Sequence, residues 1–269
     1  MHDDLLTEFD RDGYVAIRGA LAGGALRACQ EAYERLLAGP LQEGERKPVY
    51  RATRIIEREP AFTELIDHPS LLPLLRTVIG RDVTLASAGE AYWNPAGAKA
   101  FISWHGDFQW MVDVPHPRQN FWVRATWLLD DVDADTGPMT VLPGSHREPH
   151  PCPDDLTGPD GQPREIPGQV ALTGKAGDLF LNHTELWHTN TANRGTRPRK
   201  LAMMTFKHAW MRQWGQGHEV SAAFAEAQTD PIRRQLCNAG DWHVFDGQWP
   251  CARIPSLRDR SPRSAGARA

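Results

Sequence analysis

Residues 103–110, SWHGDFQW, place a histidine and an aspartate two positions apart, His105 and Asp107. Alternate side chains of an extended strand point to the same face, so an imidazole and a carboxylate at this spacing can bind one metal ion. The triplet alone is weak evidence, because roughly one His-x-Asp is expected by chance in a chain of this kind. His2 and Asp4 repeat it at the amino terminus, where backbones are commonly frayed. A metal site therefore needs a third ligand from elsewhere in the chain.

Two histidines in residues 177–190, GDLFLNHTELWHTN, are candidates for this third ligand. A Gly-Asp pair, an apolar run and a turn predict a hairpin in which His183 lies near the turn and His188 enters the returning strand. We favour His188 as the ligand and expect His183 at the turn or behind the ligands. The alternative for His188 is a core histidine that is hydrogen-bonded to the backbone.

Three arginines follow within residues 188–200, HTNTANRGTRPRK. Arg199 opens the next predicted strand, one position before the apolar run KLAMMTF. A guanidinium at that position can reach into a barrel and bind a carboxylate through two parallel hydrogen bonds. Arg194 and Arg197 lie in the predicted turn, where we expect solvated side chains.

The elements that must position these residues change character along the chain. Helical patterns fill much of residues 1–80: a helix, a turn at Gly13 and a strand come first, and a helix ending at Gly39 follows. Residues 60–80 predict two further helical segments broken at Pro69. From Val83 onward, short β-branched and aromatic runs alternate with turns, and KAFISWH reads as a strand ending at the His-x-Asp triplet. The pattern predicts a mainly β protein with flanking helices and a jelly-roll, cupin-like core of about eight strands.

A chain of 269 residues is long enough for one domain with a large core, and we expect one, over residues 1–258. Within it we expect a helical part at 1–80, the jelly-roll core at 83–211 and a helical extension at 218–258. Residues 259–269 have the composition of a disordered tail.

Charge and cysteine usage exclude several classes of function. The formal net charge of -4, with acidic and basic residues intermixed, argues against nucleic-acid binding. No apolar run approaches a membrane span, and the first residues lack the features of a secretion signal. The four cysteines form no C-x-x-C pair, which suits reduced thiols better than disulfides or structural zinc. We expect a cytoplasmic protein, monomeric or homodimeric, that binds a small molecule.

Taken in order, the motifs resemble the phytanoyl-CoA dioxygenase-like family of iron- and 2-oxoglutarate-dependent oxygenases over residues 9–208. His105 and Asp107 look like the first two iron ligands of that family, and His188 looks like the distal histidine. Residues 136–146, TGPMTVLPGSH, are similar to its signature loop. The resemblance implies a double-stranded β-helix as the core of the fold.

The resemblance also implies the chemistry. Two imidazoles and one carboxylate leave three positions open on an octahedral Fe(II), which 2-oxoglutarate and O2 would fill, and Arg199 stands where the family binds the far carboxylate of 2-oxoglutarate. Succinate and CO2 would form as an aliphatic C–H bond of a small metabolite is hydroxylated. Asp107 disfavours halogenation, because related halogenases carry a small residue there. Desaturation, epimerisation and cyclisation stay open.

Further contacts are carried over from the same family. Trp127 and Asn190 correspond to positions at the 2-oxoglutarate pocket, although a strand tryptophan also suits plain core packing. Aromatic residues near the iron are candidates for substrate contacts, with plain core packing as the more common role of such residues: Phe108, Trp110 and Trp93. Arg51 and Arg54 are candidates for binding an acidic substrate group, with a solvated strand face as the alternative.

Locally, HGDFQW and GPM-x-VLPGSH are most similar to ectoine hydroxylase-like members, which act on small polar solutes. Those members carry a longer aromatic and acidic stretch after the first motif, where this chain has QWMVDVPHPRQNFWV. This departure argues against ectoine itself as the substrate.

Two other classes of protein stay open. A non-enzymatic jelly-roll binding module predicts neither iron binding nor 2-oxoglutarate turnover, and a zinc-dependent cupin-type enzyme predicts a metal without 2-oxoglutarate. Arg199 favours the oxygenase, because neither alternative needs an arginine at that position relative to His188.

Overall fold

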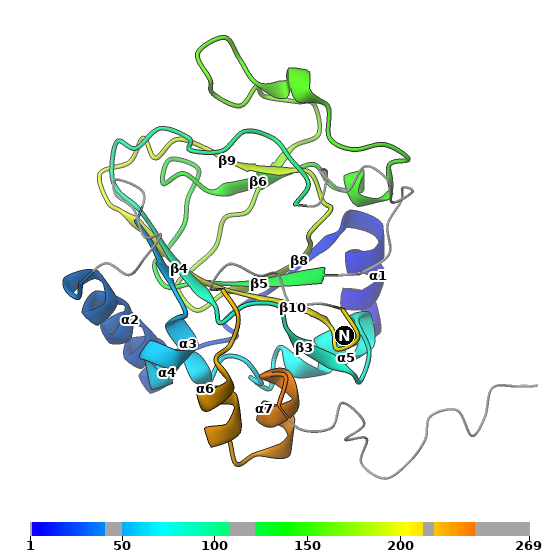
Figure 1. The fold of residues 1–269 in the computed structure, drawn as a ribbon. Helices are drawn as coiled ribbons and strands as arrows, with labels where there is room; N and C mark the ends of the chain where they lie inside the picture. Colours follow the sequence, from blue (N-terminus) through cyan, green and yellow to red (C-terminus); the bar gives the residue numbers. More distant parts are fainter. Residues whose placement is uncertain (1, 41–49, 108–121, 212–217, 240–269) are drawn as a thin grey trace, which may run out of the picture.

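The computed structural model describes residues 2–40, 50–107, 122–211 and 218–239. Two antiparallel sheets form its centre, one of seven strands in the order β1-β8-β5-β10-β4-β2 with β3 on β10, and one of three strands, β7-β6-β9. The smaller sheet lies over one face of the larger, and helices α2 to α7 gather on the other side (Figure 1). The expected class, a mainly β jelly roll with flanking helices, is confirmed.

The larger sheet consists of β1 (Tyr14–Ile17), β2 (Tyr50–Thr53), β3 (Val83–Leu85), β4 (Glu90–Asn94), β5 (Trp122–Leu128), β8 (Leu179–His183) and β10 (Arg199–His208). The smaller consists of β6 (Met139–Val141), β7 (Val170–Ala171) and β9 (His188–Asn190). The strand expected after Gly13 is β1, and from Val83 onward the described residues form eight strands, β3 to β10, in line with the predicted number.

The helices are α1 (His2–Asp12), α2 (Gly23–Ala38), α3 (Ile55–Arg58), α4 (Pro60–Thr63), α5 (Leu72–Val78), α6 (Ala222–Ala227) and α7 (Pro231–Leu236), with 3-10 turns η1 (Ser145–Arg147) and η2 (Asp154–Leu156). Helices α6 and α7 fall in the expected carboxy-terminal extension, whose residues 240–258 lie outside the described residues, as do residues 259–269. No described helix combines the length and apolar character needed to cross a bilayer.

The turn between α1 and β1 illustrates how the sequence specifies local structure. Gly13 has a φ of +81°, and a Cβ atom there would lie 2.5 Å from Nδ1 of His146. Glycine adopts this positive φ without strain, and it has no Cβ atom to clash with His146. The turn therefore packs directly against the loop that contains TGPMTVLPGSH.

Strand β5 lies between β8 and β10, and its two faces meet different surroundings. Val123, Ala125 and Trp127 belong to the main hydrophobic core, which the helices cover. Arg124 and Thr126 alternate with them and face the space between the two sheets, where they line a cavity. The inner face of the jelly roll therefore carries the polar side chains of this strand.

One expected strand is wrong. Residues 99–104 form no strand, and only His105 makes an isolated antiparallel bridge, with His188. Side chains of β9 take the place of a ladder: Oδ1 of Asn190 accepts hydrogen bonds from the backbone N–H groups of Phe101 and Ile102, at 3.3 and 3.1 Å. The backbone of this segment is satisfied without regular pairing.

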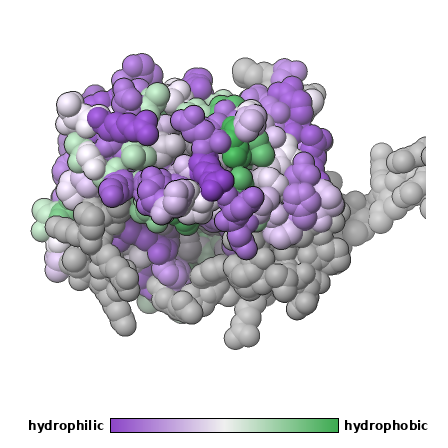
Figure 2. Space-filling model, turned by 90° about the horizontal axis from the view of Figure 1, so that it is seen from above, coloured by the Kyte–Doolittle hydropathy of each residue, from purple (hydrophilic) through white to green (hydrophobic). Residues whose placement is uncertain are grey.

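Seen from the side of the smaller sheet, the described surface is largely hydrophilic, and the strongest hydrophobic colour is confined to one small area (Figure 2). Two of the exposed large hydrophobic side chains are Phe101 and Ile102, next to the segment that leads to His105. The described residues of this face form no broad apolar patch of the kind that marks extensive protein contacts.

Candidate active site

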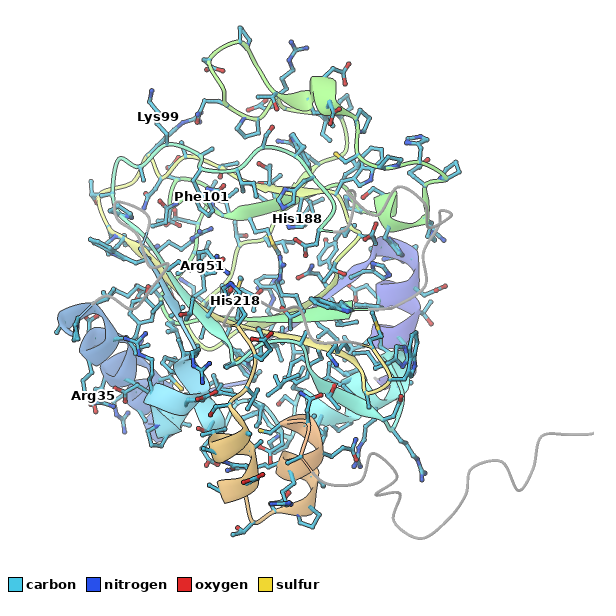
Figure 3. All side chains as sticks on the ribbon, viewed as in Figure 1. Arg35, Arg51, Lys99, Phe101, His188 and His218 are labelled. Carbon is cyan, nitrogen blue, oxygen red and sulfur yellow. The ribbon has the colours of Figure 1, made fainter. Side chains whose placement is uncertain are left out.

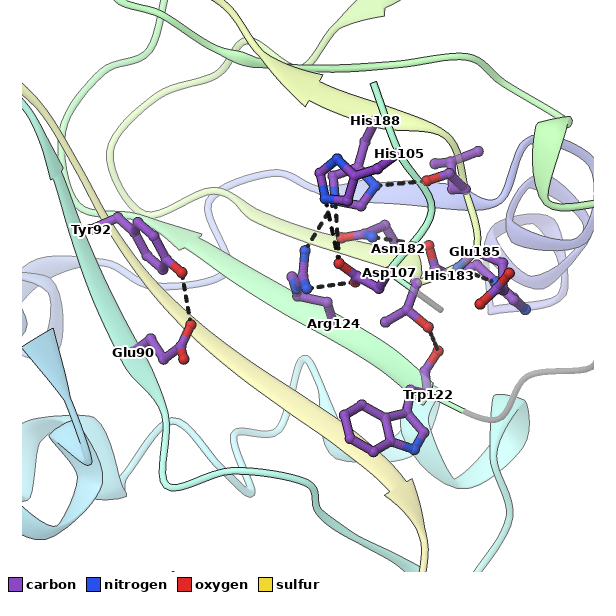
Figure 4. Close-up of polar contacts among 12 residues, drawn as sticks. Glu90, Tyr92, His105, Asp107, Trp122, Arg124, Asn182, His183, Glu185 and His188 are labelled. Atoms are coloured by element: carbon purple, nitrogen blue, oxygen red, sulfur yellow. Dashed lines mark hydrogen bonds and ion pairs between the residues drawn. The ribbon is translucent and has the colours of Figure 1, made fainter. Parts of the chain in front are cut away.

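His105, Asp107 and His188 meet between the two sheets, with one ligand atom of each within 4.8 Å of the others. Oδ1 of Asp107 lies 3.7 Å from Nε2 of His105 and 3.7 Å from Nε2 of His188 (Figure 4). The His105–His188 bridge holds the two imidazoles side by side, with ring centroids 4.2 Å apart. The structure therefore brings together the three residues that the sequence selects as metal ligands.

Backbone hydrogen bonds fix the orientation of both imidazoles. Nδ1 of His105 donates to the carbonyl of Ser103 at 2.8 Å, and Nδ1 of His188 donates to that of Leu186 at 2.7 Å. These bonds favour the tautomer that carries its proton on Nδ1, so that each Nε2 presents a lone pair that can bind a metal. Burial lowers the pKa of His188 to about 3 and also lowers that of His105, which keeps both rings neutral at pH 7.

Arg124, on β5, is a functional residue that the sequence reasoning missed. Its Nη2 donates to Oδ2 of Asp107 at 2.6 Å, and its Nη1 lies 3.4 Å from Nε2 of His188. Burial opposes ionisation of Asp107, but the charge of Arg124 and its hydrogen bond outweigh it, and the pKa of the carboxyl is below its ordinary value. Asp107 is therefore held as a carboxylate that can bind a cation. The alternation of Arg124 and Thr126 with apolar residues in WVRATWL was the available signal.

The triad opens into a cavity that is also lined by Arg199. The wall is mostly apolar, and its large side chains include Leu128, Met139, Phe180, Leu201 and Met203. We call this space the metal cavity. Its shape and lining suit a short aliphatic chain with a charged group at one end.

Arg199 is 3% exposed and donates to the carbonyl of Gly137, and its Nε has no hydrogen-bond partner among the described residues. Burial lowers its pKa to about 10, and no described carboxylate forms an ion pair with it. A buried cation without a counter-ion is costly, so the site fits an anionic ligand. Of the neighbouring arginines, Arg197 pairs with Asp133 at 2.7 Å and Arg194 is exposed.

Trp127 does not line the metal cavity. It is fully buried on the opposite face of β5, in the main core, where its ring lies 5.1 Å from that of His68. Trp93 likewise packs against the core, and its neighbour Tyr92 faces the cavity instead. Strand alternation explains both results, because adjacent residues point to opposite faces.

Asn190 does line the metal cavity, where its side chain also orders the segment before His105. His183 lies apart from the triad: its Nδ1 accepts from the backbone of Glu185 at 3.0 Å, and its ring lies 5.3 Å from that of His146. Two further residues expected to contact the substrate, Phe108 and Trp110, lie outside the described residues.

A His-x-Asp and a distal histidine inside a jelly roll, with a counter-ion-free arginine in the same cavity, define an iron- and 2-oxoglutarate-dependent oxygenase. The chain belongs to the phytanoyl-CoA dioxygenase (PhyH) family, whose sequence profile matches residues 9–201.

Among its relatives is the ectoine dioxygenase of Sphingopyxis alaskensis, 27% identical over 225 residues, with 74% of this chain and 73% of the relative covered. The ectoine dioxygenase of Nocardia farcinica is also 27% identical, over 235 residues, with 77% of this chain and 78% of the relative covered. Both values lie well below the identity at which a shared substrate would follow from similarity alone.

Solved structures show the same architecture. EctD from S. alaskensis with bound Fe has a TM-score of 0.64 at 25% identity, covering 77% of this chain and 76% of that chain. HygX from Streptomyces hygroscopicus, with nickel and 2-oxoglutarate bound, has a TM-score of 0.65 at 17% identity, covering 82% of this chain and 92% of that chain. The epimerase SnoN from nogalamycin biosynthesis has a TM-score of 0.61 at 23% identity, covering 77% of this chain and 81% of that chain. These last two likenesses concern the fold alone.

Proposed function

We propose that this protein is a non-heme Fe(II)- and 2-oxoglutarate-dependent dioxygenase that hydroxylates an aliphatic C–H bond of a small polar metabolite. One observation carries the proposal: the triad and Arg199, a buried cation without a counter-ion, share one cavity. The triad alone would also suit a zinc cupin-type enzyme. Arg199 gives the cavity a place for a carboxylate, which neither that enzyme nor a simple binding module requires.

Each described residue has a distinct task in this proposal. His105, Asp107 and His188 hold the iron, and Arg199 binds the distal carboxylate of 2-oxoglutarate. With O2, the iron and 2-oxoglutarate supply the oxidant, and succinate and CO2 are the co-products. Arg124 keeps Asp107 ionised and turned toward the histidines. The apolar wall excludes water from the reacting centre.

The names of the relatives support a small polar substrate, since the curated relatives named above are ectoine dioxygenases.

The buried, free thiols of Cys29, Cys152 and Cys237 support a reducing, cytoplasmic location. We propose a monomer or homodimer, which light scattering after size-exclusion chromatography measures directly.

Anaerobic titration of the Fe(II)-loaded protein with 2-oxoglutarate tests the proposed function. A metal-to-ligand charge-transfer band should appear, and admitting O2 with a small polar metabolite that fits the site should stimulate succinate formation. The variant His188→Ala should give neither. Metal binding without the band would favour the zinc enzyme, and binding of neither component would favour the binding module.

A further inference from the structure

A second cavity adjoins the metal cavity and has a different character. We call it the polar chamber; its side chains include Arg51, Glu90, Thr205 and His218. Asp107, Tyr92 and Arg124 line both spaces. The polar chamber therefore reaches the metal ligands through a shared wall.

The strands show on which side of the triad the polar chamber lies. Along β10, Arg199, Leu201 and Met203 line the metal cavity, and Thr205, the next inward residue, lines the polar chamber. Thr205 pairs with Arg124 on β5, which contacts Asp107. Six residues of strand span about 20 Å, so Arg199 and the polar chamber lie at opposite ends of this inner face. A co-substrate anchored on Arg199 leaves the polar chamber free for a second molecule.

Glu90 is the centre of a charged network in the polar chamber. Arg51 pairs with Oε1 of its carboxylate, and the hydroxyl of Tyr92 donates to Oε2 at 2.9 Å. Nδ1 of His218 lies 3.6 Å from Oε1. Arg51 and His218 lie close together below His188 in Figure 3, and Figure 4 shows Glu90 and Tyr92 on the side of Arg124 that faces away from Asp107. Both oxygens of Glu90 are thus occupied by groups of the protein.

The Nε atoms of Arg51 and Arg124 are buried donors beside the polar chamber, and neither has a hydrogen-bond partner among the described residues. The Arg51 side chain is 38% exposed, so its guanidinium is reachable from the chamber. Nη2 of Arg51 is bonded to Glu90 and its Nε is buried, so a ligand in the chamber meets the remaining, exposed part of the guanidinium. An anionic acceptor makes the strongest hydrogen bond to such a cationic donor. The free groups therefore select a ligand that carries an anionic acceptor.

We propose that the polar chamber binds the molecule that is oxidised, and that this molecule is a small carboxylate whose charged group pairs with Arg51. This inference rests on the proposed function, since it places the target C–H bond next to the metal ligands. Arg51 acts in binding and orientation and takes no part in the redox step.

Matched acids and amides test the proposal: N-acetylglycine with N-acetylglycinamide, and cyclohexanecarboxylate with its amide. Their dissociation constants are measured by saturation-transfer NMR on Zn(II)-loaded protein at a 2-oxoglutarate concentration that just fills the site. Each acid should bind about five to ten times more tightly than its amide. Arg51→Gln should remove this preference, and Arg51→Lys should retain part of it.

Arg35→Gln is the matched control, because Arg35 forms a two-pronged pair with Glu59 on the surface of α2, far from the cavities (Figure 3). The acid preference should survive in this control. Equal binding of acid and amide by the wild type, or an acid preference that survives Arg51→Gln, would overturn the proposal. If the wild type formed no Fe(II)–2-oxoglutarate charge-transfer band, that separate result would overturn the proposed function instead.

Discussion

Nη2 of Arg124 donates to Oδ2 of Asp107 at 2.6 Å, while Oδ1 of the same carboxylate faces the Nε2 atoms of both histidines. One carboxylate oxygen is thereby committed to the protein and the other is left for the metal. Arg124 also supplies a positive charge at the point where the metal cavity and the polar chamber meet. Its contribution to metal binding can be measured separately from that of the ligands.

Replacing Arg124 with Gln should lower the affinity for Fe(II) or Co(II) by about 10- to 100-fold, since groups that orient a ligand contribute on this scale. Arg124→Lys should lose less, because it keeps the charge without the planar fork. Anaerobic metal titration measures the effect. Arg197→Gln removes a surface pair with Asp133 and is the control. Unchanged affinity in Arg124→Gln would show that Asp107 needs no such support.

His188→Ala should abolish metal binding, and His183→Ala should retain it with at most a partial loss of activity. The two residues lie five positions apart on β8 and β9, yet only His188 approaches Asp107. Metal content of the purified variants measures the difference. Loss of the metal in His183→Ala together with its retention in His188→Ala would reverse the assignment.

Arg199→Ala should weaken 2-oxoglutarate binding by about two decades, since an unpaired buried carboxylate costs on the order of 3 kcal/mol. Arg199→Lys should fall between that variant and the wild type, because one ammonium group cannot reproduce two parallel N–H bonds. Titration of the charge-transfer band gives both constants. If Arg197→Ala weakened binding and Arg199→Ala did not, the neighbouring arginine would be the anchor.

Trp127→Phe should lower the free energy of unfolding by about 1–3 kcal/mol and leave the dissociation constant of 2-oxoglutarate unchanged. The reason is that Trp127 fills the main core behind β5, away from the metal cavity. Urea unfolding and the anaerobic titration measure the two quantities. If Trp127→Phe bound 2-oxoglutarate more weakly while its free energy of unfolding stayed unchanged, Trp127 would line the pocket after all.

Lys207 gives a pH dependence of stability. It is fully buried, its ammonium donates to the carbonyl of Met211 at 2.8 Å, and burial lowers its pKa to about 8. The unfolded chain, with a lysine pKa of about 10.4, binds more protons between these two values, so this residue makes stability rise with pH there.

Between pH 7.5 and 9.5 the wild type should gain about 2 kcal/mol of stability relative to Lys207→Met. Urea unfolding at both pH values measures the difference. Lys99→Met, at an exposed position, should follow the wild type (Figure 3). Parallel pH curves for the wild type and Lys207→Met would mean that the buried ammonium keeps an ordinary pKa.

The sequence allowed the fold class and the approximate site to be predicted, because hairpin and turn patterns are local. The choice of His188 over His183 followed from which residue enters the returning strand, and the structure places His188 beside Asp107. The strand expected at residues 99–105 failed for a physical reason. Side chains of Asn190 and Thr189 hydrogen-bond its backbone in place of a ladder, and such long-range substitutions leave no local pattern.

The orientation of Trp127 was not predictable from β5 itself. Nearly every residue of that strand is buried, since one face meets the helix-covered core and the other the inner cavities. The alternation of Arg124 and Thr126 with apolar residues separates the two faces, but the strand alone does not indicate which face meets the metal cavity. The role of Arg124 was missed because its partner Asp107 lies on a different segment.

The paired backbone bonds between His105 and His188, at 3.0 and 2.9 Å in the two directions, restrict how this protein can tolerate insertions and deletions. A change of one residue within 184–187 would shift the register of β9 and turn the His188 imidazole to the opposite face. Length variation among homologues should therefore avoid residues 184–187, the segment that sets the position of His188 opposite His105.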